Sequence, residues 1–238
     1  MNDPVVIEHE DILVVRDDLI RGGTKARFMS TLFDDADEVV YASPAEGGAQ
    51  SALSYTAANL GKRATIFVAK RKEQHPRAIE CKRLGAKVML VAPGYLTVVQ
   101  ARAREYCART GAKLAPFGID TPWAISAISR AAKATGVKPD EVWCAAGSGV
   151  LARGLAAAWP SARMHVVEVG RKLSPSDVAA ATIHLAGMPF SKADKTRTPF
   201  PSDPHYDAKA WRICKARHGP GIVLFWNVML PAAQALRR

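Results

Sequence analysis

Short apolar runs alternate along this chain with longer Ala-rich or amphipathic stretches, and this alternation constrains the fold more than any other feature. The runs expected to form strands are Ile12–Arg16, Glu38–Ala42, Ala64–Ala69, Lys87–Val91, Glu141–Ala145, Met164–Val169 and Ile222–Trp226. The stretches expected to form helices are Thr24–Phe33, Ala49–Leu60, Pro76–Leu84, Leu96–Thr110, Pro122–Thr135 and Val150–Trp159. Strands joined by helices predict right-handed crossovers and an α/β fold with mostly parallel sheets covered on both faces.

Glycines mark the expected helix ends. Gly61, Gly85, Gly111 and Gly136 each follow a helical stretch, as capping glycines do. One segment, 171–221, departs from the alternation because it is rich in proline and in basic residues. Such an irregular basic segment either covers a site or contacts a partner, or it is a plain connection packed on the sheet.

Composition excludes several classes of protein. The chain has 238 residues, 48% of them hydrophobic, which is enough for a sizeable core, and it has no apolar run long enough to span a membrane. The start of the chain lacks the pattern of a secretory signal. The four cysteines are scattered and the six histidines show no i, i+4 pair, so we expect a cytoplasmic protein without a metal site.

The charge is strongly basic, with 33 Lys and Arg against 22 Asp and Glu and a net charge of +11. Such an excess attracts polyanions, which here means nucleic acid, an acidic membrane surface or a phosphorylated ligand. A solvated basic surface that only keeps the protein soluble is the alternative.

The first candidate segment runs from Arg16 to Phe28. A strand ends there, Gly22 and Gly23 turn the chain, and Lys25 falls in the first turn of an expected helix. The positive end of a helix dipole favours the neutral form of an amine, which suits a nucleophile that condenses with a carbonyl group. A solvated lysine or a phosphate ligand remains the alternative.

The second candidate segment, 45–61, follows an apolar strand and opens an Ala-rich helix. Gly47 and Gly48 allow the backbone to approach a flat or anionic ligand, and the start of the helix offers N–H donors. An ordinary tight turn between a strand and a helix is the alternative.

The third candidate segment, 142–155, contains a strand, a Gly-Ser-Gly turn and a helix. Gly147, Ser148 and Gly149 form the pattern of a phosphate cup built from backbone N–H groups and one hydroxyl. The segment is not a P-loop, because no Gly-Lys-Ser/Thr closes it, and Ala152 stands where a dinucleotide fingerprint needs glycine. A turn without a ligand is the alternative.

In this order the three segments resemble those of the fold type II, or tryptophan synthase β-like, pyridoxal-phosphate enzymes. Residues 17–27 are similar to the 1-aminocyclopropane-1-carboxylate deaminase and D-cysteine desulfhydrase branch. That branch has an acidic-Asp-Leu strand end and Gly-Gly-Asn-Lys-x-Arg where this chain has Asp-Asp-Leu and Gly-Gly-Thr-Lys-Ala-Arg. The second segment is similar to the Ser-x-Gly-Asn loop of serine and threonine dehydratases, and 147–155 resembles the family's phosphate loop. The resemblance covers residues 11–155.

The resemblance implies that the cofactor is pyridoxal 5'-phosphate and that Lys25, the catalytic residue, holds it as a Schiff base. The remaining cofactor-binding residues that it implies are Gly48, Gly147, Ser148 and Gly149, and the substrate-binding residues are Thr24, Gly47, Gln50 and Ser51. It also implies two lobes with doubly wound, mostly parallel sheets, and a homodimer. The large cofactor lobe would be 1–39 and 121–238, and the smaller α/β lobe 40–120.

Three positions depart from the family's pattern. The asparagine that contacts the phenolic oxygen of the cofactor falls at Gly48, and the Gly-Thr of the phosphate loop is Val150-Leu151. No Ser or Thr near the C-terminus can be assigned as the partner of the pyridine nitrogen. The chain is also short for this family.

The resemblance therefore implies a pyridoxal-phosphate-dependent lyase or decarboxylase-type enzyme that acts at the α-carbon of an amino-acid group. The charge favours an amino-acid group carried by DNA, as in the phage-encoded enzymes of this family that process amino acids attached to thymine bases. In that case the protein works in the host cytoplasm, and its basic segment contacts DNA phosphates. Two alternatives stay open: a deaminase, desulfhydrase or dehydratase of a free small amino acid, and a non-catalytic binding module that has kept the fold.

Overall fold

The computed structural model describes residues 3–237, which divide into two compact units. The first unit comprises residues up to 20 together with 120–231, and the second comprises 21–119 together with the residues from 232 onward. The first contains a six-stranded sheet in the order β1-β2-β10-β7-β8-β9, and the second a four-stranded sheet in the order β5-β4-β3-β6. Only the β1–β2 pair among the described strands is antiparallel, which confirms the expected α/β class.

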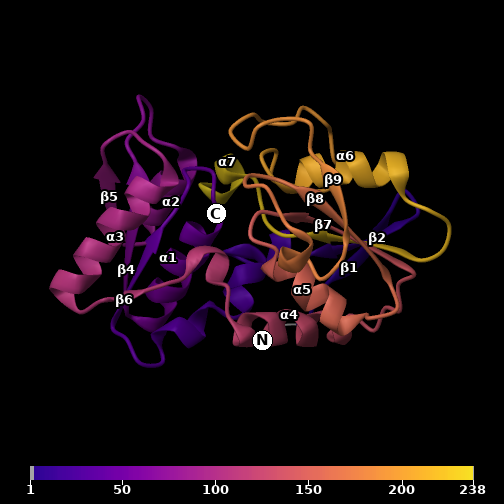
Figure 1. Cartoon of the computed structure of the whole chain (residues 1–238), viewed down its shortest axis with the longest axis horizontal. Coiled ribbons are helices and arrows are strands. Elements are labelled where there is room, and N and C mark those ends of the chain that lie inside the picture. The colour runs from indigo at the N-terminus through magenta and orange to yellow at the C-terminus, as the bar shows by residue number, and fades with distance from the viewer. Residues whose placement is uncertain (1–2, 238) are drawn as a thin grey trace. The chain divides into compact units, whose positions relative to one another are not determined.

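In the first unit, helices cover both faces of the sheet. The strands are β1 (Val6–His9), β2 (Ile12–Arg16), β7 (Glu141–Ala146), β8 (Arg163–Glu168), β9 (Thr182–Leu185) and β10 (Val223–Asn227). The helices are α4 (Pro122–Ala134), α5 (Val150–Ala158) and α6 (Asp207–Arg217), with short 3₁₀ turns η1 (Asp17–Leu19) and η5 (Pro175–Asp177). Helix α6 lies on one face and α4 and α5 lie on the other (Figure 1).

The second unit is built in the same way around its smaller parallel sheet. Its strands are β3 (Glu38–Ala42), β4 (Arg63–Ala69), β5 (Lys87–Val91) and β6 (Lys113–Leu114). Its helices are α1 (Ala49–Leu60), α2 (Pro76–Arg83), α3 (Leu96–Thr110) and α7 (Ala232–Ala235), with 3₁₀ segments η2 (Gly23–Arg27), η3 (Met29–Phe33) and η4 (Phe117–Ile119). Helix α3 packs on β3 and β4 through Val99 and Ala103, which contact Val40 and its neighbours on that face.

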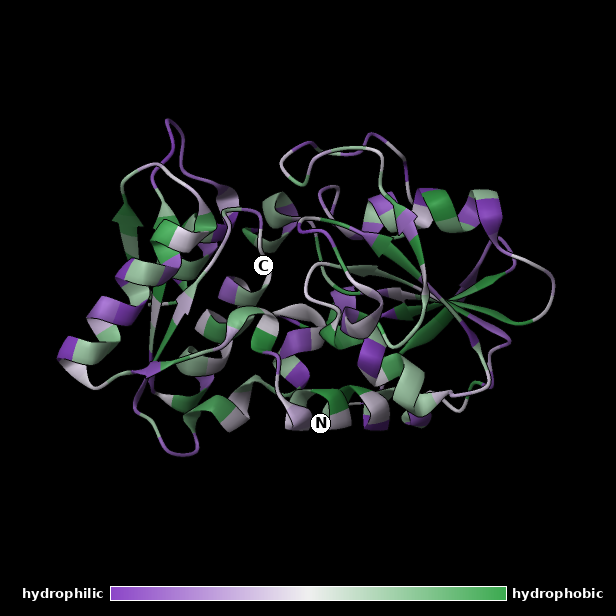
Figure 2. Cartoon of the chain, viewed as in Figure 1, coloured by the Kyte–Doolittle hydropathy of each residue, from purple (hydrophilic) through white to green (hydrophobic). Residues whose placement is uncertain are grey.

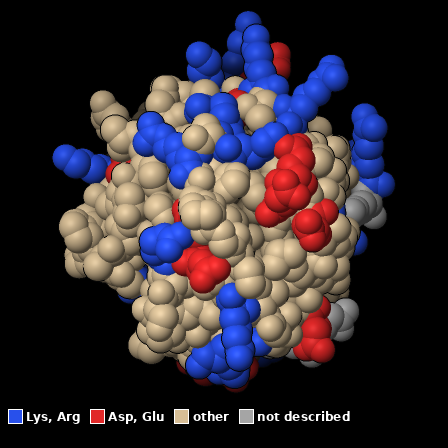
Figure 3. Space-filling view, turned by 90° about the vertical axis from the view of Figure 1, so that its right-hand side faces the viewer, with Lys and Arg blue, Asp and Glu red and all other residues tan. Residues whose placement is uncertain are grey.

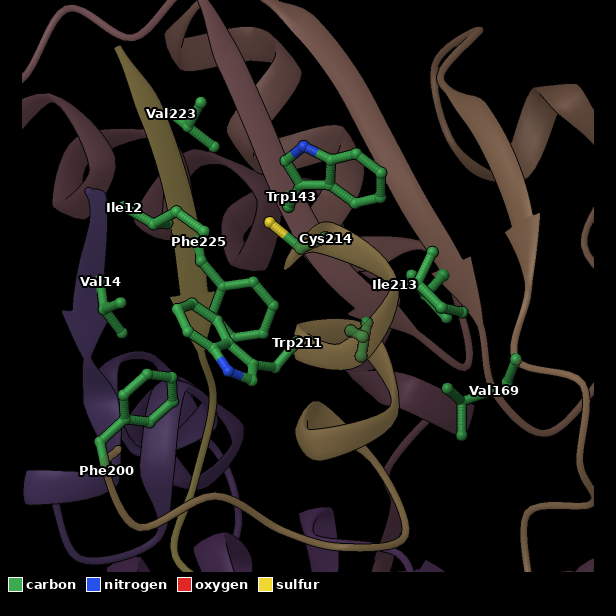
Figure 4. Close-up of a cluster of buried hydrophobic side chains, with 14 residues drawn as sticks. Ile12, Val14, Trp143, Val169, Phe200, Trp211, Ile213, Cys214, Val223 and Phe225 are labelled. Atoms are coloured by element: carbon green, nitrogen blue, oxygen red, sulfur yellow. The ribbon is translucent and has the colours of Figure 1, made fainter. Parts of the chain in front are cut away.

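A large core cluster lies between α6 and the six-stranded sheet. Trp211 of α6 packs edge-on against Phe225 of β10 and Phe200, with ring centroids 5.3 and 4.9 Å apart (Figure 4). The central strands are apolar on both faces because each face is covered by helices. Hydrophobic residues accordingly predominate along the strands of the six-stranded sheet, whereas the helices mix hydrophobic and hydrophilic residues (Figure 2). These two faces hold the ends of the central strands rigidly in place.

Most of the predicted elements are confirmed, several of them to the residue. The bounds of β2, β3, β5, α1 and α3 are those expected. Gly61 and Gly111 cap their helices in the left-handed conformation, and Gly85 and Gly136 also have positive φ angles. Each of these elements is defined by its own neighbouring residues, so local signals were sufficient here.

The expectation of one helix over Thr24–Phe33 was wrong. The segment forms two 3₁₀ turns, η2 and η3, which meet at Phe28, a residue with φ −137°. Both turns pack against α1, and a Cβ on Gly22 would lie only 3.0 Å from the Cα of Ala52. This tight packing overrides the weak helix propensity of a segment that starts with two glycines.

Segment 171–221 is also more regular than its composition indicated, since it contains η5, β9 and α6. Prolines restrict the connections but leave 207–217 free to form a helix. The sequence analysis did not anticipate β1, β6 and α7, which are two to four residues long. Residues 21–39, expected in the large lobe, pack with the second unit. In the part of the chain described here, no helix is both long and apolar enough to cross a membrane.

Candidate active site

In the first unit, polar groups gather at the carboxyl edge of the six-stranded sheet. Strands β2, β10, β7 and β8 are parallel neighbours, so the segments that follow them emerge at the same edge. Open α/β sheets bind ligands outside this edge. The glycine loop after β7, predicted to be a phosphate cup, lies here.

The glycine loop requires glycine at its last position. Gly149 has φ +85° and is the N-cap of α5, and a Cβ placed on it would lie 1.9 Å from the carbonyl oxygen of Asp177. The N–H of Gly147 donates to the hydroxyl of Tyr206 at 3.0 Å, and that hydroxyl donates in turn to the carbonyl of Ala145. One of the three predicted cup donors therefore has a partner within the protein. The first-turn N–H groups of α5 have no partner within the helix, as at every helix start.

A buried carboxyl group that the sequence analysis missed lies at the same edge. Asp207, the first residue of α6, is fully buried, and its Oδ2 accepts from the N–H of Val228 at 3.1 Å. The backbone N–H of Met229 also acts on the carboxyl, but no donor is well aligned with Oδ1. Burial, and then the negative charge of Asp203, raise the pKa of Asp207 well above the ordinary value of a carboxyl group. The Oγ of Ser202 and the Oδ1 of Asn227 are likewise buried without a partner. The helical spacing of apolar residues over α6 was the one sequence signal that could have shown that Asp207 begins a helix.

The end of β2 is tied to the end of β10 by buried polar contacts. Arg16 donates two hydrogen bonds to Asp18, at 2.8 and 2.9 Å, and the amide of Asn227 donates to the same carboxylate at 2.7 Å. The indole N–H of Trp226 donates to Asp17 at 3.1 Å. The Asp-Asp-Leu run singled out in the sequence thus holds two neighbouring strand ends together.

In the second unit, Lys25 lies half-buried in η2, beside helix α1. Because η2 is a 3₁₀ turn of five residues rather than the start of an α-helix, the dipole argument for activating the amine has no α-helix to support it. Thr24, the neighbouring residue predicted to bind substrate, is buried.

The loop before α1 carries the remaining predicted residues. Gly48 is the N-cap of α1, where no side chain caps the helix, and a Cβ on Gly47 would lie 2.8 Å from the Oγ of Ser43. Gln50 is fully buried and its amide donates to three carbonyls of the loop, those of residues 44, 45 and 47. Gln50 therefore fixes the shape of the loop from inside.

Ser51 is held in a second buried network of the same unit. Its hydroxyl donates to Glu80 of α2 at 2.6 Å, and Glu80 also pairs with Arg77 at 3.4 Å. All three side chains are almost fully buried. The network joins the start of α1 to α2. The backbone N–H groups in the first turn of α1 take no part in it and remain donors at the helix start.

The predicted residues thus fall into two sets. Lys25, Thr24 and residues 47–51 lie on adjoining elements of the second unit, and residues 147–149 lie with the newly located Asp207 on one sheet edge of the first. Among the described residues, no group of three or more His, Cys, Asp or Glu side chains could hold a metal ion. A glycine cradle at a helix start and a buried carboxyl on the same sheet edge fit a ligand that has both a phosphate group and a ring nitrogen.

Comparison with known proteins identifies the family. A family model described as pyridoxal-phosphate dependent enzyme matches residues 7–227. No curated protein shows a sequence match. Among solved structures, a homologue of ACC deaminase superposes with a TM-score of 0.81 at 19% identity, covering 96% of this chain and 90% of its own.

Two further solved structures give similar values. A threonine deaminase from T.th. has a TM-score of 0.71 at 18% identity, covering 96% of this chain and 92% of its own. Diaminopropionate ammonia lyase from Escherichia coli has a TM-score of 0.68 at 15% identity, covering 95% of this chain and 80% of its own. The family match and the shared fold confirm both the tryptophan synthase β-like fold and the expected cofactor. This chain therefore belongs to the pyridoxal-phosphate-dependent enzymes of fold type II.

Proposed function

We propose that the protein is a lyase or deaminase that cleaves a bond at the α-carbon of an amino-acid group, with Lys25 as the catalytic residue. The observation that carries this proposal is the sheet edge of the first unit, where the glycine loop lies beside the buried carboxyl of Asp207. The names of the similar structures, a deaminase homologue, a deaminase and an ammonia lyase, support the same reaction class.

In the first unit, residues 147–149 bind the phosphate of the cofactor in this proposal. The N–H groups at the start of α5 and the hydroxyl of Ser148 donate to it. Tyr206 holds the loop in place through Gly147. Asp207, whose Oδ1 is buried without a partner of good geometry, shares a proton with the ring nitrogen in a hydrogen bond and takes the role that no residue could be given from the sequence.

In the second unit, the start of α1 binds the carboxylate of the substrate. The helix has no side-chain cap, so its first N–H groups are available to an anion. Gly47 and Gly48 let the backbone approach the ligand, while the buried Gln50 and Ser51 keep the loop in shape. Gly48 also removes the side chain that usually contacts the cofactor's phenolic oxygen.

Pyridoxal phosphate, when bound, supplies an electron sink for the bond that breaks at the α-carbon. Lys25 would provide the amine that holds the cofactor, and the same amine could take up or return a proton at the substrate.

The cofactor spectrum tests the proposal. Wild-type protein incubated with pyridoxal phosphate is expected to show a visible absorbance band that persists through gel filtration, and the Lys25→Ala variant to lose it. Lys62→Ala is the matched control, because Lys62 belongs to the same unit but is engaged with carbonyls of Phe33 and Ala36. A band that survives in Lys25→Ala, or that is absent from the wild type, would refute the proposal and favour a non-catalytic relic of the fold.

A DNA-linked amino-acid group remains a second candidate substrate, and one observation favours it. Residues 21–119 with 232–238 carry 18 Lys and Arg against 8 Asp and Glu, whereas the rest of the chain carries 15 against 14. The excess is therefore concentrated in the second unit and not in segment 171–221. Figure 3 faces the first unit, and basic side chains project from the upper part of that face too, beside acidic ones.

Salt-dependent binding separates the two substrate classes. If the substrate is carried by DNA, affinity for duplex DNA is expected to fall steeply with salt. The double variant Lys70→Gln, Lys72→Gln, which removes two exposed charges of the second unit, should make that slope shallower, and Lys192→Gln, Lys195→Gln in the first unit should change it less. No binding at low salt leaves the free amino acid as the substrate.

A further inference from the structure

The segment that follows β8 forms a rim over the glycine loop. The carbonyl of Asp177 lies so close to Gly149 that no side chain fits there, and the Cβ of Asp177 would be 3.3 Å from a Cβ on that glycine. From the other end of the segment, the guanidinium of Arg171 donates to the carbonyl of Ser148 at 3.4 Å. Two oppositely charged side chains are thus attached to the rim of the loop.

These two side chains form an ion pair with each other. Arg171 donates to both carboxylate oxygens of Asp177, at 2.5 and 3.3 Å, and the N–H and hydroxyl of Ser174 donate to the same carboxylate at 2.8 and 2.7 Å. The bonds from Arg171, and then those from Ser174, lower the pKa of Asp177 and so favour its charged form.

A charged carboxylate at the rim of a phosphate cup opposes the binding of a phosphate dianion. Like charges held close together repel each other even in water. The N–H groups of the loop offer only partial positive charge. Arg171 supplies the full positive charge that cancels the carboxylate.

We propose that Arg171 and Asp177 form a charge-balancing pair that sets the affinity of the glycine loop for phosphate, and thereby the preference for pyridoxal phosphate over pyridoxal. The inference rests on the proposed role of residues 147–149 as the phosphate cup. Neither residue belongs to the loop pattern itself, which is why the sequence did not reveal them. Arg171 is a positioning residue, because it acts through Asp177 and the rim.

A two-variant cycle tests the pair. Dissociation constants for pyridoxal phosphate and for pyridoxal are measured by absorbance titration on the wild type, Arg171→Gln, Asp177→Asn and the double variant. Arg171→Gln is expected to weaken the binding of pyridoxal phosphate about tenfold and the binding of pyridoxal by less than about twofold, because an uncompensated carboxylate repels only the phosphate. The double variant should recover most of the affinity for pyridoxal phosphate that Arg171→Gln loses. Inorganic phosphate should compete less well with pyridoxal phosphate in Arg171→Gln than in the wild type.

Lys172→Gln is the matched control. It removes the same charge one residue further along the exposed segment, at a residue whose backbone carbonyl accepts from Arg171. The inference is overturned if Lys172→Gln has the same effect as Arg171→Gln, if pyridoxal weakens equally, or if Asp177→Asn does not rescue. Should the wild type bind both compounds equally, the phosphate cup itself fails, and this result is distinct from a failure of the pair alone.

Discussion

The proposed role of Asp207 in the site conflicts with the stability of the folded protein. Its carboxyl is fully buried and no donor is well aligned with one of its oxygens. Burial raises the pKa of Asp207, so the folded protein retains a proton that the unfolded chain loses above about pH 4. The stability that this proton provides is complete at low pH and disappears as the pH rises through the raised pKa.

We expect Asp207→Asn to stabilise the protein without cofactor at neutral pH by about 1 kcal/mol or more, because an amide is neutral in both states, whereas the carboxyl of Asp207 must keep a proton that the unfolded chain releases. The same variant should bind pyridoxal phosphate more weakly, since the ring nitrogen loses its acidic partner. Urea unfolding between about pH 4 and 8 measures the first effect and absorbance titration the second.

Asp194→Asn serves as the control, because it should change the stability in the opposite direction. Asp194 is also buried, but the N–H of Thr196 and the guanidinium of Arg212 lower its pKa despite the opposing effect of burial. Its replacement should destabilise the protein at neutral pH. If Asp207→Asn is as destabilising as Asp194→Asn, the carboxyl of Asp207 is satisfied and our account of it is wrong.

At the scale of elements, the glycine loop depends on one backbone conformation. We expect Gly149→Ala to lower the free energy of unfolding by about 3 kcal/mol or more, because a left-handed φ and a clash with Asp177 act together. Gly136→Ala, which has a positive φ but nothing within 4 Å, should cost only about 1 kcal/mol. Equal losses for the two variants, measured by denaturant unfolding, would contradict the tight contact between the loop and its rim.

Hydrogen bonds between side chains hold edge strand β9, and the donor of each bond follows from the bond before it. Arg217 can only donate, so it donates to Nδ1 of His184 at 3.4 Å, and Nε2 of His184 then donates to Nδ1 of His165 at 3.0 Å. This leaves the proton of His165 on Nε2, which lies 3.0 Å from Glu141. Both rings stack on Trp143, and both must be neutral, because a second proton would place two donors face to face.

Stability should therefore fall as the pH drops below about 6.5, the ordinary pKa of histidine. Burial lowers the pKa of both His165 and His184, so the unfolded chain takes up protons before the folded protein does. Urea unfolding from about pH 8 to 5 measures the slope. His184→Gln should flatten it, whereas His218→Gln, at an exposed position on the C-cap of α6, should leave it unchanged. A wild-type curve that is flat over this range would contradict the arrangement of protons.

For the whole molecule, the sequence predicted what depends on local pattern and missed what depends on long-range contacts. The alternation of strands and helices and the glycine loop at 147–149 could be predicted because a few neighbouring residues determine them. The two turns at 23–33 were misread because contact with α1 decides their form. Asp207 and Arg171 were missed because each is brought to the site by a segment whose prolines obscure its regular structure.

The distribution of charge also became visible only at this scale. The sequence directed attention to the basic segment 171–221, but the division of the chain into units places almost all of the surplus in the second unit. Cations form ion pairs in both units, as Arg212 does with Asp194 in the first and Arg71 with Glu46 in the second. A net charge by itself therefore says little about where a polyanion binds.

The central claim is that the amine of Lys25 holds the cofactor. The most direct test is to incubate the wild-type protein with pyridoxal phosphate, reduce it with borohydride, digest it, and map the modified lysine by mass spectrometry. The account predicts a single stoichiometric adduct on Lys25, which excess amino acid added before reduction decreases. An adduct on another lysine, or no adduct at all, would contradict it.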